Sequence, residues 1–372
     1  LGSIESDAVG DMRLMFLKPI CQPPCKRLAL EQDAELRIQL AGARVQIRRP
    51  HEQGLPVENG RLRVKTGTRR TSELIELTFL GCVRPGLELE DLHPSGSTQD
   101  RIASYILSKA WQEGIIGPGS LVCEASSGST SIAMAMVCAQ MGLRFVAVMP
   151  EGVSNERVKM IRAYGGNVRL CPADSGMDGC IALTEEIARK EGAYLPRQFD
   201  NHDKAEAHRR GTAHEILAEI PGRSAGAVVS GVGTGGTLVG LYRGIHDSGC
   251  KTIPVLARPV CISEDACYTN GCFRQFECCS FSTCVPGVMD NQSGILRSAD
   301  LDGMITIEVE EEQALETTRA LIRKGFAVGP SSGLNFAAAL EVAKQLDPAM
   351  RIVTVFPDRM ERYFSTALFR DA

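Results

Sequence analysis

The chain has 372 residues, with 45 acidic and 41 basic side chains and a net charge of −4, so no overall field favours nucleic acid or an anionic membrane as a partner. Its length allows two domains with a large core, and its 37 glycines fit an α/β protein with many tight turns. No apolar run approaches the ~20 residues that cross a bilayer. Residues 1–11 lack the basic-then-apolar order of a signal peptide. We therefore expect a cytoplasmic protein that binds neither nucleic acid nor membrane.

The N-terminal residues 1–75 differ in pattern from the rest of the chain. Apolar and polar residues alternate over 36–40 and 45–47, which is the period of a β-strand. The pair Asn59-Gly60 lies between two short apolar runs and is a hairpin-turn signal. We predict that residues 1–75 form an N-terminal extension, a small β module.

From about residue 74 onward, short apolar runs alternate with amphipathic helical stretches. The predicted pairs are strand 121–123 with helix 129–141, strand 144–148 with helix 155–164, strand 168–170 with helix 177–191 and strand 227–229 with helix 237–245, followed by a strand at 352–356. Such alternation indicates an α/β protein whose parallel sheets are covered by helices. Ligands of these folds bind beyond the carboxyl ends of the strands, where helices begin.

A glycine-rich turn at residues 230–237 (SGVGTGGT) follows one of these strands and opens a helix. Glycines let the backbone approach a ligand, and successive N–H groups at a helix N-terminus favour an anion such as phosphate. The turn has neither the Gly-Lys-Ser/Thr ending of a Walker A loop nor the Gly-x-Gly-x-x-Gly order of a dinucleotide fold. Phosphate binding is the favoured interpretation, and a plain strand–helix turn is the alternative.

Several further motifs, together with this turn, resemble one known family. In chain order they are residues 94–101 (PSGSTQDR), 124–131, 149–151, 198–201, 231–237, 329–333 and 356–366. Over about residues 72–372 the chain resembles the cysteine synthase-like enzymes (O-acetylserine sulfhydrylase and cystathionine β-synthase). These are pyridoxal phosphate (PLP) enzymes of fold type II, which is tryptophan synthase β-like. The resemblance implies a two-domain α/β fold with parallel sheets covered by helices.

The resemblance also implies a set of site residues. It assigns PLP to the phosphate cup Gly233, Thr234, Gly235, Gly236 and Thr237, to Ser331 at the pyridine nitrogen and to Ser129. It assigns a small amino-acid substrate to Ser126, Ser127, Gly128, Thr130 and Gln198, with the carboxylate on the N–H groups of the loop. It further implies a homodimer, a smaller mobile domain over 93–205 and a larger domain formed by 76–92 and 206–372, with the ligand in the cleft between them.

Residues 94–101 carry the main departure from the family, because Gln99 stands where the family has its Schiff-base lysine. A glutamine amide is neither a nucleophile nor a base, and losing positioned acid–base help costs ~10²–10⁴ in rate. Ser129 likewise replaces a family asparagine. A lysine relocated from elsewhere is an alternative, but Lys109, Lys159 and Lys204 lie on other elements. An introduced Lys→Gln substitution would explain residue 99 alone.

Two local features near this turn have structural interpretations. The spacing Ser97-x-x-Asp100 predicts a capping box at the start of a helix over 102–111, with Asp100 and Arg101 anchoring it. The histidines beside the motifs, including His208, are lone and are interpreted as structural.

A cysteine-rich segment at residues 261–284 holds six of the fourteen cysteines. They are Cys261, Cys267, Cys272, Cys278, Cys279 and Cys284. Thiolates bind zinc or an iron–sulfur cluster, although neither the Cys-x-x-Cys zinc spacing nor a ferredoxin spacing is present. Redox-active thiols and structural cysteines are the alternatives. The segment falls where the family has a glycine-rich run bordering the cofactor.

Three functional hypotheses follow from these residues. The first is a divergent lyase or β-substituting enzyme that acts on a cysteine- or serine-type amino acid, with PLP held noncovalently. The second is a catalytically silent binding or regulatory protein, motivated by Gln99 and Ser129. The third is a metal- or iron–sulfur-dependent enzyme that uses the same scaffold without PLP. No catalytic residue is assigned, because Gln99 occupies the lysine position.

Overall fold

The computed structural model describes four short N-terminal strands and residues 93–260, 285–288, 294–347 and 350–369. The six cysteines of the cysteine-rich segment and the Asn59-Gly60 turn lie outside these residues. The strand β1 (Leu36–Leu40) pairs antiparallel with β2 (Ala43–Ile47), and β3 (Val64–Lys65) pairs antiparallel with β4 (Leu74–Ile75). The strands predicted at 36–40 and 45–47 are therefore confirmed.

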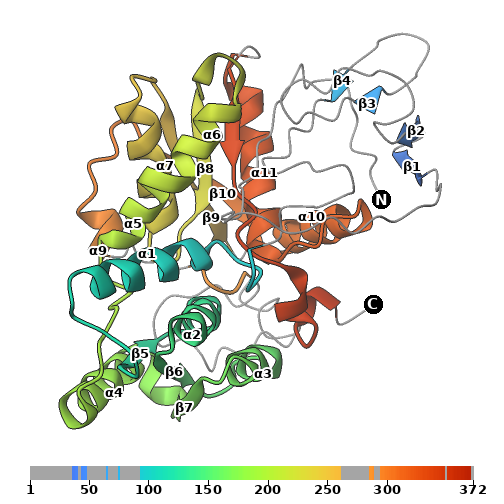
Figure 1. The fold of residues 1–372 in the computed structure, drawn as a ribbon. Helices are drawn as coiled ribbons and strands as arrows, with labels where there is room; N and C mark the ends of the chain where they lie inside the picture. Colours follow the sequence, from blue (N-terminus) through green and yellow to red (C-terminus); the bar gives the residue numbers. More distant parts are fainter. Residues whose placement is uncertain are drawn as a thin grey trace, which may run out of the picture.

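The remaining elements form two parallel sheets and the helices around them (Figure 1). The strands are β5 (Leu121–Ala125), β6 (Arg144–Pro150), β7 (Asn167–Cys171), β8 (Ala227–Gly231), β9 (Ile253–Val260), β10 (Ile305–Glu310) and β11 (Ile352–Thr354). The helices are α1 (Gln99–Gln112), α2 (Ser129–Met141), α3 (Asn155–Ala163), α4 (Gly176–Glu191), α5 (Asp203–Ala207), α6 (Ala213–Glu219), α7 (Gly236–Asp247), α9 (Gly294–Arg297), α10 (Glu311–Arg323) and α11 (Pro330–Gln345). A π-helical turn spans His208–Thr212, and 3-10 turns span Ala173–Ser175, Pro221–Arg223, Met360–Tyr363 and Ala367–Phe369.

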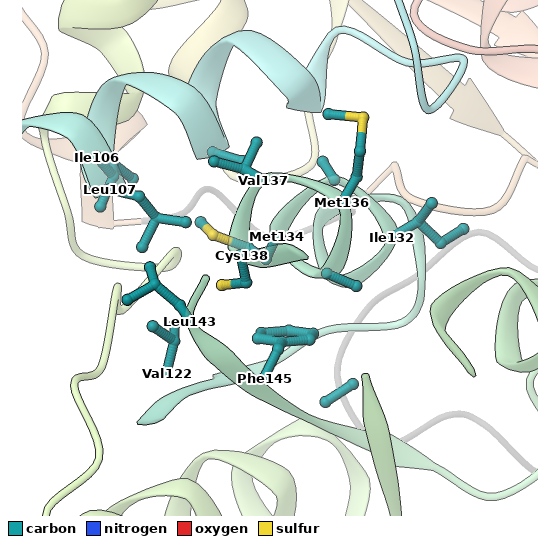
Figure 2. Close-up of a cluster of buried hydrophobic side chains, with 14 of the residues drawn as sticks. Ile106, Leu107, Val122, Ile132, Met134, Met136, Val137, Cys138, Leu143 and Phe145 are labelled. Atoms are coloured by element: carbon teal, nitrogen blue, oxygen red, sulfur yellow. The ribbon is translucent and has the colours of Figure 1, made fainter. Parts of the chain in front are cut away.

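The first sheet has the order β5-β6-β7, with all three strands parallel. Successive strand residues point to opposite faces, so the sheet builds two separate clusters. Val122 and Phe145 pack with α1 and α2 on one face (Figure 2), whereas Cys123 and Val146 pack with α4 on the other. Since β5 and β6 are apolar on both faces, they are the centre of this half of the protein.

The second sheet has the order β10-β9-β8-β11 and is also parallel throughout. Val228 and Val353 pack with α6 and α7, while Val229 and Val255 pack with α11 on the opposite face. The predicted α/β architecture is confirmed in both sheets, and the strand–helix pairs predicted at 121–141 and 227–245 are present. The proposed domain boundaries stay a prediction.

Helix α1 connects the two halves. It packs against α2 of the first half and against α5 near the second sheet (Figure 1). Both terminal guanidinium nitrogens of Arg101, Nη1 and Nη2, donate to the Glu215 carboxylate, at 2.7 and 2.6 Å. A bidentate Arg–carboxylate pair fixes orientation as well as distance, so Arg101 ties α1 to α6. The predicted anchoring role of Arg101 agrees with this contact.

The predicted capping box is wrong. Helix α1 begins at Gln99, three residues before the predicted start, and its N-cap residue Thr98 makes no side-chain cap bond. Asp100 instead accepts hydrogen bonds from the backbone N–H of Ser95, at 2.8 Å, and from the Ser95 hydroxyl. The Asp100 carboxylate therefore stabilises the turn before the helix instead of capping the helix.

Residues 93–98 form the turn that directly precedes Gln99 and are here called the Gln99 turn. They are held by residues near the C-terminus. Ser97 forms an isolated antiparallel bridge with Asp358, and the Thr98 N–H donates to the Pro357 carbonyl at 2.8 Å. The fully buried Arg362 donates to the carbonyl of Gly96 at 2.8 Å and to that of Ser95. The C-terminal segment, residues 356–363, thus fixes the turn from which Gln99 and helix α1 begin.

Among the helices that the structure describes, none is long and apolar enough to cross a membrane.

Helix α7 lies unusually close to α5 and the π-helical turn, because it presents glycines to them. A Cβ added at Gly240 would lie 2.3 Å from the Ala205 carbonyl oxygen and 2.6 Å from the His208 Cβ. Alanine there would have to displace backbone, although alanine is otherwise the better helix former by about 1 kcal/mol. The close approach brings α5 to the glycine-rich turn that opens α7.

We expect Gly240→Ala to lower the free energy of unfolding by about 1–3 kcal/mol, since overpacking outweighs helix propensity. Urea unfolding followed by circular dichroism measures this. The matched control is Gly117→Ala, because nothing lies within 4 Å of a Cβ at Gly117. We expect the control to stay within about 0.5 kcal/mol of the wild type. A stabilised Gly240→Ala variant would contradict the tight contact.

Candidate functional site

One pocket collects the residues that the sequence motifs single out. It lies where α1, α2, α7 and α11 begin, with the C-terminal segment on one side. Of the residues predicted to bind cofactor or substrate, those that line it are Ser126, Ser127, Ser129, Thr130, Gln198, Gly233, Thr234, Gly235, Gly236, Thr237 and Ser331. Gln99 lines it as well, and Gly128 is the one predicted site residue that does not. Helix N-termini converging on one pocket favour an anionic ligand.

Residues 230–237 are here called the phosphate loop, after the ligand that the sequence predicts for them. At some of its glycines the backbone approaches its neighbours too closely for a side chain. A Cβ at Gly233 would lie 2.3 Å from the Gly287 carbonyl oxygen, and one at Gly236 would lie 2.9 Å from the Lys204 Cβ. Gly235, the N-cap of α7, has a φ of 85°, a left-handed conformation that glycine adopts without strain. These glycines leave the backbone N–H groups at the start of α7 as the lining of the pocket.

Ser331 and Ser129 face the pocket at the starts of α11 and α2. The Ser129 hydroxyl donates to Asp358 Oδ2 at 3.3 Å, and the Tyr363 hydroxyl donates to the same oxygen at 2.6 Å. Burial raises the pKa of Asp358, although Arg362 opposes this shift. Its other oxygen, Oδ1, is buried and has no hydrogen-bond partner in the described part of the chain. A polar ligand here would meet an unsatisfied carboxyl oxygen.

Residues 126–131, the carboxylate loop, are shaped by their first serine. The Ser126 hydroxyl oxygen accepts the N–H groups of Gly128, at 2.9 Å, and of Ser131, at 3.2 Å. The Gly128 N–H is therefore engaged within the loop, whereas the resemblance assigned it to the substrate. A Cβ at Gly128 would lie 2.3 Å from Arg157 Cδ, so this glycine admits the arginine beneath the loop.

A chain of hydrogen bonds runs along the pocket wall from Gln99. Thr130 Oγ lies 3.1 Å from Gln99 Oε1 and 2.8 Å from Gln198 Oε1. One hydroxyl carries one hydrogen, so only one of these oxygens can receive it. The Gln198 amide is oriented by the bond from its own Nε2 to the Ala125 carbonyl. Its Oε1 also accepts from Lys204 Nζ at 3.2 Å.

Lys204 is the principal site residue that the sequence interpretation does not assign. It lies on α5, is 1% exposed and lines the pocket. Of the other lysines considered as replacements for residue 99, Lys109 binds both oxygens of Asp203 at 2.9 Å, and neither it nor Lys159 lines the pocket. The sequence did contain a signal for this residue. Lys204, His208 and Thr212 recur every four residues, and this spacing places three polar side chains on one helical face.

Lys204 shares its surroundings with the buried carboxylate of Glu124. Burial raises the pKa of Glu124 to about 7 and lowers that of Lys204 to about 8, while the attraction between the two charges opposes both shifts. Glu124 accepts the backbone N–H groups of Ala125, at 2.9 Å, and of Gln198, at 3.1 Å. Within the described residues, the two side chains form no direct ion pair.

His208 is fully buried beside the phosphate loop. Its Nδ1 lies 3.0 Å from the Thr212 hydroxyl, and its Nε2 lies 3.3 Å from the Thr237 hydroxyl. Burial lowers the pKa of His208 to about 3, and the charges of Arg101 and Lys204 add to the effect. The imidazole is therefore neutral near pH 7 and orients Thr237 as a hydrogen-bonded neighbour, consistent with its structural interpretation.

The lowered pKa of His208 makes folding sensitive to acid. The unfolded chain takes up a proton at this histidine near pH 6.5, whereas the folded chain does so only near pH 3, so stability falls as the pH drops below 6.5. Between pH 7 and 5 the loss attributable to His208 is about 2 kcal/mol, at about 1.4 kcal/mol for each pH unit below 6.5. Urea titrations measure the unfolding free energy at each pH. Between pH 7 and pH 5, we expect it to fall by about 2 kcal/mol less in His208→Gln than in the wild type. Equal decreases in variant and wild type would contradict it.

No group of three or more His, Cys, Asp or Glu side chains suited to a metal ion occurs among the residues that the structure describes. The six cysteines predicted as ligands lie outside those residues, so that prediction stays open.

Known proteins are similar to this chain over three quarters of its length. An O-ureido-L-serine synthase from Streptomyces lavendulae is 36% identical over 285 residues, which cover 76% of this chain and 84% of the relative. A probable cysteine synthase from Bacillus subtilis (strain 168) is 36% identical over 287 residues, which cover 76% and 89%. A crystal structure of O-ureido-L-serine synthase superimposes with a TM-score of 0.66 at 34% identity, covering 76% of this chain and 86% of that chain.

A family model described as pyridoxal-phosphate dependent enzyme matches residues 70–358, which include the Gln99 turn, both loops and Ser331. The fold, the order of the motifs and these similarities agree, and the chain therefore belongs to the family of pyridoxal-phosphate dependent enzymes, with the cysteine synthases among its relatives.

Proposed function

We propose that this chain binds PLP in the described pocket and carries out a β-replacement or elimination on a serine- or cysteine-type amino acid. The observation that carries the proposal is the phosphate loop, whose glycines at 233, 235 and 236 can be exchanged for no larger residue without a clash or backbone strain. It faces the same pocket as the carboxylate loop. A phosphorylated cofactor and an amino-acid carboxylate are two anions, and each has a helix N-terminus to bind it.

The residues present fit PLP. The N–H groups at the start of α7 and the Thr237 hydroxyl would hold its phosphate, and Ser331 lies at the start of α11, where the family resemblance puts the pyridine nitrogen. Asp358 Oδ1, buried without a partner among the described residues, gives a further polar contact for the ligand. Bound PLP withdraws electrons from the substrate α-carbon and so makes its proton easier to remove.

The remaining residues position the substrate. The N–H groups of Ser127, Ser129 and Thr130 would bind the substrate carboxylate at the start of α2. Gln198, held by Ala125 and Glu124, would keep the Thr130 side chain of this loop in place through Oε1. Gln99 offers an amide contact but cannot accept a proton near neutral pH. Its Oε1 lies 3.1 Å from Thr130 Oγ, and this contact suggests that Gln99 supports the carboxylate loop.

The names of the relatives support the substrate class. They are a synthase of O-ureido-L-serine and a probable synthase of cysteine, both amino acids that carry a substituent on the β-carbon. The experiment supplies the purified chain with PLP, O-acetyl-L-serine and sulfide, and measures L-cysteine. We expect product formation that depends on PLP. Bound PLP with no product from O-acetylserine, L-serine or L-cysteine would favour the catalytically silent binding protein that Gln99 suggests.

Binding of the phosphate can be tested at Thr237. We expect Thr237→Val to weaken PLP binding about 10- to 100-fold, because the phosphate loses one charge-assisted hydrogen bond of about 1.5–3 kcal/mol. Equilibrium dialysis measures the dissociation constant. The matched control is Thr252→Val, a buried hydroxyl outside the pocket that has no partner among the described residues. Equal affinities in both variants would mean that the phosphate binds elsewhere.

Three expectations stay proposals: a homodimer, a cytoplasmic location, and a division into a domain over 93–205 and a domain formed by 76–92 and 206–372. Light scattering coupled to size-exclusion chromatography would test the first.

A further inference from the structure

The lysine missing at residue 99 raises the question of which group in the pocket is an amine. Lys204 is the one lysine among the described residues that line it. It lies on the first turn of α5, 1% exposed, with its Cβ directly against the backbone of the phosphate loop at Gly236. A lysine side chain is almost never fully buried without a partner that explains it. Its role is therefore open to a functional explanation.

An ion pair with a carboxylate does not account for the burial of Lys204. Its ammonium donates to one neutral acceptor, Gln198 Oε1 at 3.2 Å, and no carboxylate within the described part of the chain lies in ion-pair distance. Lys109 shows the contrast, since both oxygens of Asp203 satisfy it. The acidic group whose charge acts on the pKa of Lys204 is Glu124, whose oxygens are already bound to backbone N–H groups. The charge at Lys204 is thus incompletely satisfied.

A series of side-chain contacts also connects Lys204 to residue 99, the position at which the family has its lysine. Three contacts link them along one wall of the pocket: Lys204 Nζ to Gln198 Oε1, Gln198 Oε1 to Thr130 Oγ, and Thr130 Oγ to Gln99 Oε1, at 3.2, 2.8 and 3.1 Å. Two of these side chains, Thr130 and Gln198, are residues that the family resemblance assigns to the substrate. The amine therefore reaches the substrate side of the pocket from α5.

The surroundings favour a nucleophilic amine. Burial lowers the pKa of Lys204 to about 8, against 10.5 for an ordinary lysine, so that roughly a tenth of the amine is neutral at pH 7. His208 lies one helical turn from Lys204 on the same helical face, and because burial keeps it neutral, it does not take a proton from the amine near neutral pH. A desolvated lysine with a lowered pKa is the form that attacks carbonyl groups.

We propose that Lys204 supplies the amine that residue 99 lacks, by forming a reversible carbon–nitrogen double bond with the aldehyde of the cofactor. This inference rests on the proposed function. The neutral ε-amine adds to the aldehyde carbon, a C=N bond replaces C=O, and the aldehyde oxygen leaves as water with the two amine hydrogens. No oxidant or other reactant is needed. The covalent anchor then comes from α5 instead of from the turn before α1.

The test treats the full-length protein with pyridoxal 5′-phosphate and then with sodium borohydride, which reduces a C=N bond to a stable C–N bond. Peptide mass spectrometry locates the adduct. We expect close to one adduct per chain, on the peptide that contains Lys204. We expect Lys204→Arg, which keeps the charge but has no primary amine, to lose it. The matched control Lys109→Arg should keep it. An adduct confined to other lysines would overturn the proposal.

A second ligand separates failure of this inference from failure of the proposed function. Pyridoxine 5′-phosphate carries an alcohol in place of the aldehyde, so it can occupy the pocket without a covalent bond. We expect it to bind wild type and Lys204→Arg within about 3-fold, while pyridoxal 5′-phosphate binds the wild type at least 10-fold more tightly than the variant. If pyridoxine phosphate binds but no adduct forms at Lys204, the cofactor is held noncovalently and this inference alone is wrong. If neither ligand binds, both proposals are wrong.

Discussion

The fully buried guanidinium of Arg362, which donates to the carbonyls of Ser95 and Gly96, holds the pocket together. These are charge-assisted bonds between segments more than 260 residues apart, and losing a partner of a buried charge is costly. Around them, Thr98 pairs with Pro357 and Gly329 pairs with Asp358. The C-terminal segment therefore joins the starts of α1 and α11, so the Gln99 turn and Ser331 are placed by a single strip of backbone.

The opposite wall depends on a different constraint, the absence of side chains at three glycine positions of α7. Gly236, Gly240 and Gly244 face α5 and the π-helical turn, and a Cβ on any of them would approach a neighbour within 3 Å. The helices can therefore meet at backbone distance, which seats Lys204 against the phosphate loop and His208 beside Thr237. A larger helix separation would withdraw Lys204 from the pocket and His208 from Thr237. The position of the amine is thus a consequence of the glycines on another helix.

These two constraints explain what the sequence can and cannot predict. The phosphate loop is predictable because its requirements are local: a strand, a run of glycines and a helix start. The α/β architecture follows from alternating strand and helix patterns for the same reason. The capping box at Ser97 and Asp100 failed because the Asp100 carboxylate binds Ser95 instead, and because the contact of Thr98 with Pro357, which no local pattern contains, fixes the turn. The spacing of Lys204, His208 and Thr212 is visible in the sequence. A polar stripe on a short helix is equally typical of a solvent-exposed face, so the spacing does not predict that these residues are buried.

Gln99 and Lys204 are best understood together. Two ammonium groups in one pocket would repel each other, by about 4 kcal/mol at a separation of ~4 Å and an effective dielectric constant of ~20, and by less when they are further apart. A pocket with lysines at both positions would thus disfavour the charge of each, in addition to the cost of burial. With glutamine at 99, the same wall offers hydrogen bonds to Thr130, and Gln198 Oε1 serves as an acceptor for the single amine. The glutamine is then compatible with the proposed activity, because it leaves Lys204 as the one lysine among the described residues that line the pocket.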